Sequence, residues 1–441
     1  MIRLAATRLA LLCACLPACT GAPRDDDSAP GRAGDVDAAL VARGDAVDAP
    51  AAGAVDAPAA RAEAERGAAL ARASAPGGAT VASVARESLG GDVYHETFTF
   101  TLDARPNAKL RLHRVVREKA PWVPRATRGG AMLMHGDFSS FAGNFAPSVN
   151  APGGAEGLAV WLAREGFDVW GLDRRWATTP ADGDLSDFDA MSVAQELDDV
   201  GLALASARAL RLASGAGADR LHLLGFSRGG YLAYAYAALE GARPAWQRHV
   251  KGLVPLDMWA EIAPDDAAAR AATCETAAFE RDALAQGFVD SENGFFIELG
   301  QLALSAPEAT SPFTFFGDVT NRGAFLITAA QTYSFFFPTP RYHLAASAIV
   351  DGAPTGLTES SETTIAQWFA HAVPHQSMRE SAESDGAQCG DGQGPPGSDL
   401  SRISVPLFYV GAAGGYGTHG LYSTIRVAST DVSTLVVQRF G

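Results

Sequence analysis

The chain has 441 residues, of which 47% are hydrophobic and 19% charged, a composition typical of a folded globular protein. Its formal net charge of −15 argues against a nucleic-acid-binding protein, which needs a basic face to neutralise phosphates. The large side chains are unevenly distributed, because all 22 Phe, 9 Tyr and 7 Trp residues lie at or after Tyr94. We therefore expect the folded core to lie in the part of the chain that follows.

Residues 1–19 have the pattern of an export signal. Arg3 and Arg8 precede an apolar run at 9–16, which is too short to cross a bilayer as a helix. The run ends in the letters LPAC, which resemble the bacterial lipobox, in which the Cys thiol is lipidated and becomes the first residue of the mature chain. We expect an exported protein that is lipid-anchored to a bacterial membrane through Cys19, or secreted if Cys19 is not lipidated.

Residues 20–90 are rich in Ala, Asp, Gly and Pro and contain no aromatic side chain. Such a segment has little to bury, so we expect it to be a disordered tether between a membrane and the folded domain. Residues 60–72 have helix propensity because Ala, Glu and Arg dominate them, but their pattern shows no apolar face.

The following part of the chain alternates between expected strands and helices. Apolar and polar residues alternate over 97–102 and 110–113, which indicates two half-buried strands. Helical patterns lie at 158–164 and 193–213. Buried strands are expected at 131–134, 167–172, 221–226, 252–256, 405–410 and 434–438. This order predicts an α/β fold with a mostly parallel central sheet and helices on both faces.

Residues 259–401 interrupt this alternation and divide the expected core into 91–258 and 402–441. We expect the insert to form a helical cap over the carboxyl edge of the sheet, before the penultimate strand, because α/β proteins place their sites at that edge. Its many aromatic residues either form a core of their own or, in part, line a pocket for an apolar substrate. Cys274 and Cys389 both lie in the insert and could form a disulfide in an exported protein.

The letters GFSRG at 225–229 match the G-x-S-x-G pattern of a nucleophile at a sharp turn. An apolar strand runs into the motif and a helix-compatible segment follows it. The turn requires small residues two positions before and two positions after the nucleophile, and Gly225 and Gly229 meet this requirement. Ser227 would lie at a helix amino terminus, where partial positive charge favours an oxyanion. Ser227 is therefore the candidate nucleophile.

A second motif lies upstream, where the strand at 131–134 runs into His135 and a glycine. With the serine motif it resembles the α/β-hydrolase family, over about residues 93–441. The resemblance implies that the backbone N–H groups of Asp137 (or Phe138) and Arg228 hold the oxyanion of the reaction. It also implies that His135 is a structural residue of this loop rather than the catalytic base.

The segment 158–170, with the letters DRR at 173–175 and FDAM at 188–191, is similar to the acid-lipase branch of that family. This local likeness implies an ester or lipid substrate. Neither a metal ion nor an organic cofactor is implied.

The other two members of a serine–histidine–acid triad are harder to assign. No carboxylate follows the strand at 405–410, where the family carries its acid. Asp257, which ends the preceding expected strand, is the best substitute, although it is equally well an ordinary loop residue, and Asp431 is a weaker candidate. The family's histidine follows the last strand, and the given sequence ends at Gly441, where that histidine would come next. Either the sequence continues, or His419 serves as the base.

Two further histidines, His371 and His375, have a spacing that hints at a metal pair, but Pro374 lies between them and no third ligand is near. His222 lies in an expected strand and is expected to pack in the core. The leading hypothesis is an exported, membrane-tethered serine hydrolase that cleaves carboxylic esters, lipids included. The alternative is a non-catalytic surface lipoprotein that uses the same fold as a binding module. Peptidases, thioesterases and acyltransferases of this fold share the same motifs.

Overall fold

The computed structural model describes residues 57–151, 155–330, 345, 347–350, 353–358, 360–390, 398–413 and 415–437. The expected export signal and Cys19 therefore lie outside the described residues. None of the helices in the described ranges combines the length and the apolar character needed to cross a bilayer.

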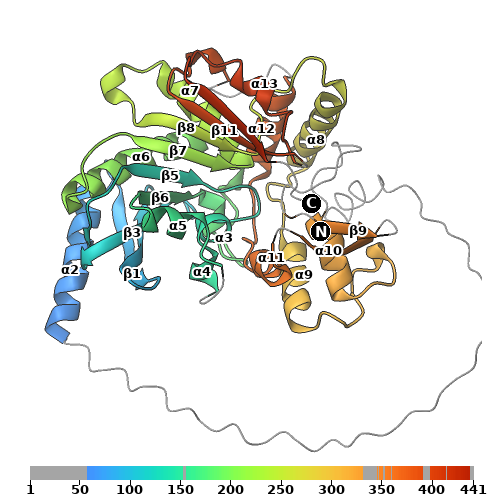
Figure 1. Cartoon of the computed structure of the whole chain (residues 1–441), viewed down its shortest axis with the longest axis horizontal. Helices are drawn as coiled ribbons and strands as arrows, with labels where there is room; N and C mark the ends of the chain where they lie inside the picture. The colour runs from blue at the N-terminus through green and yellow to red at the C-terminus, as the bar shows by residue number, and fades with distance from the viewer. Residues whose placement is uncertain are drawn as a thin grey trace, which may run out of the picture. The chain divides into compact units, whose positions relative to one another are not determined.

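A mixed central sheet organises the described residues (Figure 1). Its strands are β1 (Thr80–Ser88), β2 (Val93–Thr101), β3 (Lys109–Ala120), β4 (Val123–Pro124), β5 (Gly130–Met134), β6 (Asp168–Asp173), β7 (Leu221–Phe226), β8 (Val250–Leu256), β11 (Leu407–Ala412) and β12 (Val432–Val437). They follow the order β1-β2-β3-β6-β5-β7-β8-β11-β12, with β4 paired to β3. Pairing is antiparallel from β1 to β6 and parallel from β6 to β12, which confirms the predicted mostly parallel α/β sheet.

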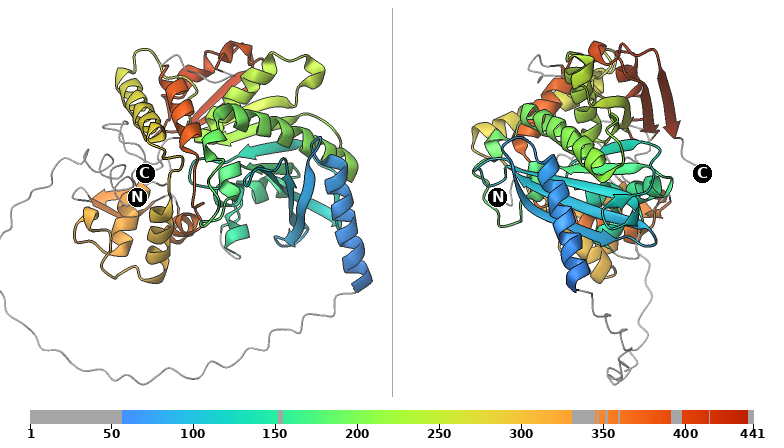
Figure 2. Two further views of the ribbon diagram at one scale, coloured as in Figure 1. Left: turned by 180° about the vertical axis from the view of Figure 1, so that it is seen from behind. Right: turned by 90° about the vertical axis from the view of Figure 1, so that its left-hand side faces the viewer.

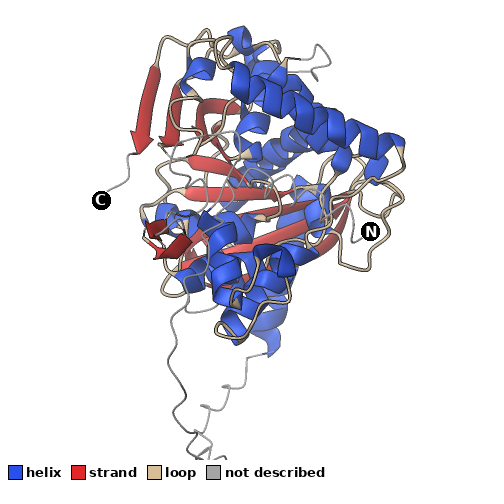
Figure 3. Ribbon diagram, turned by 90° about the vertical axis from the view of Figure 1, so that its right-hand side faces the viewer, coloured by secondary structure: helices blue, strands red, loops and turns tan. Residues whose placement is uncertain are grey.

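Helices cover both faces of this sheet (Figure 3). Those outside the insert are α3 (Phe141–Phe145), α4 (Pro147–Asn150), α5 (Leu158–Arg164), α6 (Val193–Ser214), α7 (Arg228–Gly241) and α13 (Leu421–Thr424). Alternate side chains of a strand point to opposite faces, and β5 shows the result. Met132 and Met134 pack in the core that contains α6 and α7, whereas Ala131 and Leu133 pack with α3 and α5.

The parallel strands bring several chain segments to one edge of the sheet. Leu256 pairs with Phe226 on one side and with Val410 on the other, so β7, β8 and β11 end side by side. The residues that follow these strands therefore gather at the carboxyl edge, where α/β folds place their sites. β12 forms the outer edge of the sheet beyond β11 (Figure 2, right).

The prediction of disorder over 20–90 is wrong from residue 57 onward, where the helix propensity noted for 60–72 corresponds to a formed helix. Helix α2 (Ala57–Ser74) and strand β1 are formed there, and β1 pairs with β2 along its length. The second half of α2 contributes Leu70 and Ala71 to the core, and Gly67 lies against the ring of Trp122. Apart from Leu70, the buried face of this helix consists of small residues, so the hydrophobic pattern does not reveal it.

The insert begins after β8 and ends before β11, as expected. Its helices are α8 (Ala267–Ala285), α9 (Gly294–Ser305), α10 (Asn321–Ala330), α11 (Glu362–Ala370) and α12 (Met378–Cys389), and it adds the two-stranded sheet β9 (Ser347–Val350) with β10 (Ala353–Leu357). Helices α9, α10 and α11 form a cluster apart from the main sheet (Figure 2, left). Phe325 and Phe369 are buried in this cluster, with Phe295 and Phe296 packed against it, so these aromatics form a core of the cap itself.

Helices α8 and α12 lie side by side and are covalently joined (Figure 1). Cys274 of α8 and Cys389 of α12 form a disulfide, with an S–S distance of 2.16 Å and a Cα–Cα distance of 5.3 Å. The pairing that the sequence leaves open is therefore present. It closes a segment that includes α9, α10 and α11.

Candidate active site

Ser227 lies at the turn between β7 and α7, at the carboxyl edge of the sheet. Its backbone has φ 53° and ψ −128°, a conformation that residues other than glycine rarely adopt. The residue is 5% exposed, and its backbone N–H donates to Leu256 O at 3.0 Å. A strained serine between a strand and a helix is the geometry of a nucleophile elbow.

Close contacts with neighbouring atoms leave no room for a side chain at the glycines around Ser227. A Cβ at Gly225 would lie 2.1 Å from Gly229 O, and a Cβ at Gly229 would lie 2.3 Å from Met134 O. A Cβ at Gly136 would lie 3.0 Å from the Cβ of Ser227. The backbone of the turn and that of the loop after β5 therefore approach each other too closely for side chains at these positions.

His135 opens the loop after β5 and is buried. Its Nδ1 donates to Gly136 O at 2.8 Å, and its Nε2 accepts from the backbone N–H of Arg174 at 3.2 Å. Burial, assisted by the Arg174 charge, lowers the pKa of His135 to about 3. His135 is therefore neutral with both ring nitrogens occupied, which supports the interpretation that it is structural.

The cap encloses Phe138, in the middle of the same loop. Phe138 has a φ of 59°, its N–H donates to the side-chain oxygen of Gln376 at 3.1 Å, and its carbonyl accepts from Val373 N–H. Its ring packs on Phe296 with centroids 5.3 Å apart. Because Gln376 engages the N–H of Phe138, Asp137 is the better of the two oxyanion donors that the sequence left open.

Five side chains of alternating charge connect α12 to the two expected oxyanion residues. Glu380 contacts Arg174 at 2.5 Å, and Arg174 lies 3.6 Å from one oxygen of Asp137. The other oxygen of Asp137 lies 3.3 Å from Arg228, which contacts Asp385 at 2.5 Å. We call this set the charge chain. The sequence predicts a role for the backbone groups of Asp137 and Arg228, but nothing in it indicates the ion pairs with Arg174, Glu380 and Asp385.

Asp257 directly follows β8, the strand that pairs with β7 just before Ser227. It has a φ of 47° and is 6% exposed, and one carboxylate oxygen accepts from Ala412 N–H at 2.8 Å and from Gly417 N–H at 3.0 Å. A Cβ at Gly415 would lie 2.1 Å from its other oxygen. The loop after β11 therefore wraps around this carboxylate and fixes it at the edge that carries the candidate nucleophile.

His419 lies in the loop between β11 and α13, and its carboxylate partner is Asp266. The two side chains meet at 2.6 Å, Nδ1 to Oδ2, and are 37% and 23% exposed. Asp266 also caps α8, accepting from Ala269 N–H. Among the described residues, no hydrogen bond joins Ser227 Oγ to a histidine. The sequence analysis missed Asp266, although an Asp before an Ala-rich run is a helix-start signal.

Asp431 is excluded as the triad acid. It directly precedes β12, and its carbonyl accepts from the N–H of Leu407, the first residue of β11. Because β11 and β12 run parallel to β7, Asp431 lies at the amino edge of the sheet, about 20 Å from the carboxyl edge for strands of this length.

The two histidines whose spacing hints at a metal pair contact different partners. His371 contacts Gln367 O at 2.8 Å, whereas His375 contacts Asp290 at 2.8 Å and Pro180 O at 3.1 Å, so the pair does not converge on one point. No group of three or more potential metal ligands occurs in the described ranges. His222 is half-buried in β7, where burial lowers its pKa.

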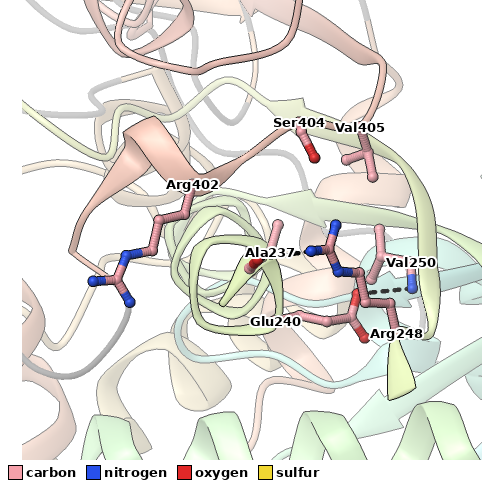
Figure 4. Close-up of a pocket in the computed structure, with 8 residues that line it drawn as sticks. Ala237, Glu240, Arg248, Val250, Arg402, Ser404 and Val405 are labelled. Carbon is pink, nitrogen blue, oxygen red and sulfur yellow. Dashed lines mark hydrogen bonds between the residues drawn. The ribbon is translucent and has the colours of Figure 1, made fainter. Parts of the chain in front are cut away.

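Two cavities adjoin α7. The smaller one lies at the end of the helix far from Ser227, beside Glu240 and Arg248 (Figure 4), and at about 10 Å³ it has room for roughly one water molecule. The larger one, of about 230 Å³, begins one turn after Ser227. Its lining is mixed: apolar and aromatic side chains such as Tyr231, Ile262 and Leu400 lie beside the polar residues Glu261, Arg270, Gln388 and Ser398.

The chain is similar to several solved structures. A candidate lipase from Sulfolobus solfataricus matches with a TM-score of 0.54 and 15% identity, over 82% of this chain and 92% of that chain. A soluble variant of monoglyceride lipase from Saccharomyces cerevisiae matches with a TM-score of 0.38 and 11% identity, over 81% and 87%. No protein-family model and no curated protein matches the chain. At these identities the likeness concerns the fold alone, and the chain has the α/β-hydrolase fold.

Proposed function

We propose that the protein is a serine hydrolase that cleaves carboxylic esters through an acyl-enzyme on Ser227. The backbone of Ser227 carries the proposal, because the φ of 53° between β7 and α7 is costly and serves to present a nucleophile. Ser227 Oγ attacks the ester carbonyl, the alcohol leaves with a proton, and water then releases the acid.

The oxyanion formed in each step is held by two backbone N–H groups, those of Asp137 and Arg228. Arg228 is the first residue of α7, and the N–H groups of a first helical turn have no partner within the helix. The partial positive charge at this helix end adds to the stabilisation of the oxyanion.

His419 is the proposed base and takes the proton of Ser227. Its contact with Asp266 orients the ring and stabilises the imidazolium that forms, as the acid of a triad does. Because no hydrogen bond joins His419 to Ser227 in the described residues, the proposal requires the loop between β11 and α13 to move toward Ser227 during the reaction. Asp257 is the alternative acid, since it directly follows β8, which pairs with the strand that leads into the nucleophile.

An ester with an apolar acyl group is the proposed substrate. The 230 Å³ cavity begins at Tyr231, one helical turn after Ser227, and offers apolar side chains such as Ile262 and Leu400 beside polar ones such as Arg270. The proposed location is outside the cytoplasm, tethered to a membrane by a lipid on Cys19. This part rests on the basic residues, the apolar run and the LPAC letters of 1–19. A Cys19→Ser variant that still partitions into detergent with the membrane fraction would refute the anchor.

Hydrolysis of p-nitrophenyl esters of increasing chain length tests the activity. The wild-type protein should release p-nitrophenol and Ser227→Ala should not, with the rate falling at least about 10³-fold. Ser214→Ala is a matched control, since it also removes one buried hydroxyl but at the end of α6. Turnover that persists in Ser227→Ala would refute the proposal. No turnover by the wild-type protein would favour the non-catalytic binding module.

A further inference from the structure

We propose that Arg174 and Arg228, anchored by Glu380 and Asp385 of the cap helix α12, are positioning residues for the oxyanion hole. The inference rests on the proposed function and concerns the charge chain defined above. Its members come from four regions of the chain, and the contact between Arg174 and Glu380 joins residues 206 positions apart. Ion pairs therefore join helix α12 of the cap to residues that follow β6 and β7 of the core.

Arg174 orients the peptide that carries the first oxyanion donor. Its guanidinium donates to Gly136 O at 2.6 Å and to His135 O at 3.0 Å, and His135 Nδ1 also donates to Gly136 O. The carbonyl of Gly136 and the N–H of Asp137 belong to one planar peptide and point in opposite directions. Two donors that hold the carbonyl therefore aim the N–H of Asp137 away from Arg174.

Arg174 and Arg228 together neutralise the carboxylate of Asp137. A carboxylate on the very residue whose N–H donates to the oxyanion lies close to the developing negative charge and would repel it. In the structure one oxygen of Asp137 faces Arg174 at 3.6 Å and the other faces Arg228 at 3.3 Å. The two guanidinium groups thus compensate a charge that would otherwise oppose the reaction.

Helix α12 holds both arginines in place. The Arg174 and Glu380 side chains are each 1% exposed, and the second oxygen of Glu380 accepts from Trp176 Nε1 at 2.7 Å. Asp385 holds Arg228 with both side chains about a tenth exposed. A long arginine side chain has many rotamers, and an ion pair in a site that excludes water restricts it far more than one at the surface.

The first test removes the two carboxylate charges that hold the arginines, in Glu380→Gln and Asp385→Asn, which keep the size of each side chain. Both variants should lower kcat for ester hydrolysis about tenfold or more while KM changes less than about threefold, because the lost interactions orient groups that act on the transition state. Glu118→Gln is the matched control, since Glu118 of β3 is as buried as Glu380 and pairs with Arg86 of β1, and the kcat of this variant should equal that of the wild-type protein. Thermal unfolding of each variant shows that it is folded. If Glu380→Gln does not fold, Asp385→Asn, at a less buried position, still tests the inference.

The second test uses a rescue that a purely structural role would not produce. Arg228→Gln leaves the Asp137 carboxylate without one of its cations, and kcat should fall about tenfold or more. The double variant Asp137→Asn/Arg228→Gln removes the repelling charge as well, and kcat should rise at least about threefold above that of Arg228→Gln alone.

The outcomes separate the inference from the proposed function. An active wild-type protein with unchanged kcat in Glu380→Gln and Asp385→Asn refutes the inference and leaves the hydrolase intact. A double variant no faster than Arg228→Gln also refutes it. A wild-type protein without Ser227-dependent turnover refutes the proposed function and, with it, the inference.

Discussion

The disulfide between α8 and α12 has a measurable consequence for stability. Reduction of the pair formed by Cys274 and Cys389 should destabilise the protein without altering any other side chain. The bridge stabilises the folded state mainly because it restricts the unfolded chain, and the effect grows with the length of the closed loop.

The magnitude follows from the sequence separation of 115 residues. In the chain-entropy treatment, closure of a loop of this length removes unfolded-state entropy worth about 4.8 kcal/mol at 25 °C. For roughly 350 folded residues the unfolding entropy is large, so this free energy corresponds to a fall in Tm of roughly 6 °C. The contacts of Arg270 with Cys389 O and Ile262 O remain after reduction and hold the end of α12 in the folded state.

The assay is thermal unfolding followed by tryptophan fluorescence, with and without reductant, at one pH and protein concentration. The variant Cys274→Ala/Cys389→Ala is the control, because its Tm should not respond to reductant. Equal Tm values for the oxidised and reduced wild-type protein would refute the reasoning. A reductant effect of the same size in the control would show that other cysteines cause it.

Three further predictions concern the site. Gly229→Ala should abolish turnover and lower the yield of folded protein, since its Cβ would lie 2.3 Å from Met134 O, and normal activity on the same ester would contradict this contact. The pKa of His135 is lowered from 6.5 to about 3, so between these pH values the imidazole is protonated in the unfolded state and neutral in the folded state. The free energy of unfolding should therefore fall as the pH falls from 6.5 to about 3, by up to about 1.4 kcal/mol per pH unit. Urea unfolding at a series of pH values measures this loss, and the unfolding free energy of His135→Asn should fall less steeply with pH than that of the wild-type protein. An equally steep fall in His135→Asn would contradict the burial argument. His419→Ala should lower kcat about 10²- to 10⁴-fold and Asp266→Asn less, whereas full ester turnover in His419→Ala would exclude it as the base.

Local patterns predicted most of the sheet and the elbow. The short apolar runs became β5 to β8 and β11, and the spacing of Gly225 and Gly229 around Ser227 corresponds to backbone contacts that exclude side chains. These features depend on neighbours in sequence, so the pattern carries them.

Strand β1 and the packing of α2 against the core were not predicted, for a physical reason. The register of β1 shifts between Val81 and Ser83, so Val81 and Val84, which pack against the core, are three positions apart instead of two. The alternation that identifies a strand is thereby lost. In α2, Ala71 and Gly67 make close contacts with almost no hydrophobic signal.

The charge chain could not be read from the sequence because its contacts are long-range. Glu380 and Asp385 lie in an insert, 206 and 157 residues from the arginines that they hold, and nothing in their local sequence differs from a solvated helix face. The same holds for Asp266 and His419, which are 153 residues apart and meet only because β8 and β11 end side by side.

The most direct test of the account is covalent labelling with a fluorophosphonate, followed by mass spectrometry of the labelled peptide. The account predicts a single phosphonyl adduct on the GFSRG segment at Ser227, and none in Ser227→Ala. Slower labelling of His419→Ala would add that a base activates this serine. A wild-type protein that stays unlabelled, or a label on any other residue, would contradict the claim that Ser227 is the nucleophile of a hydrolase.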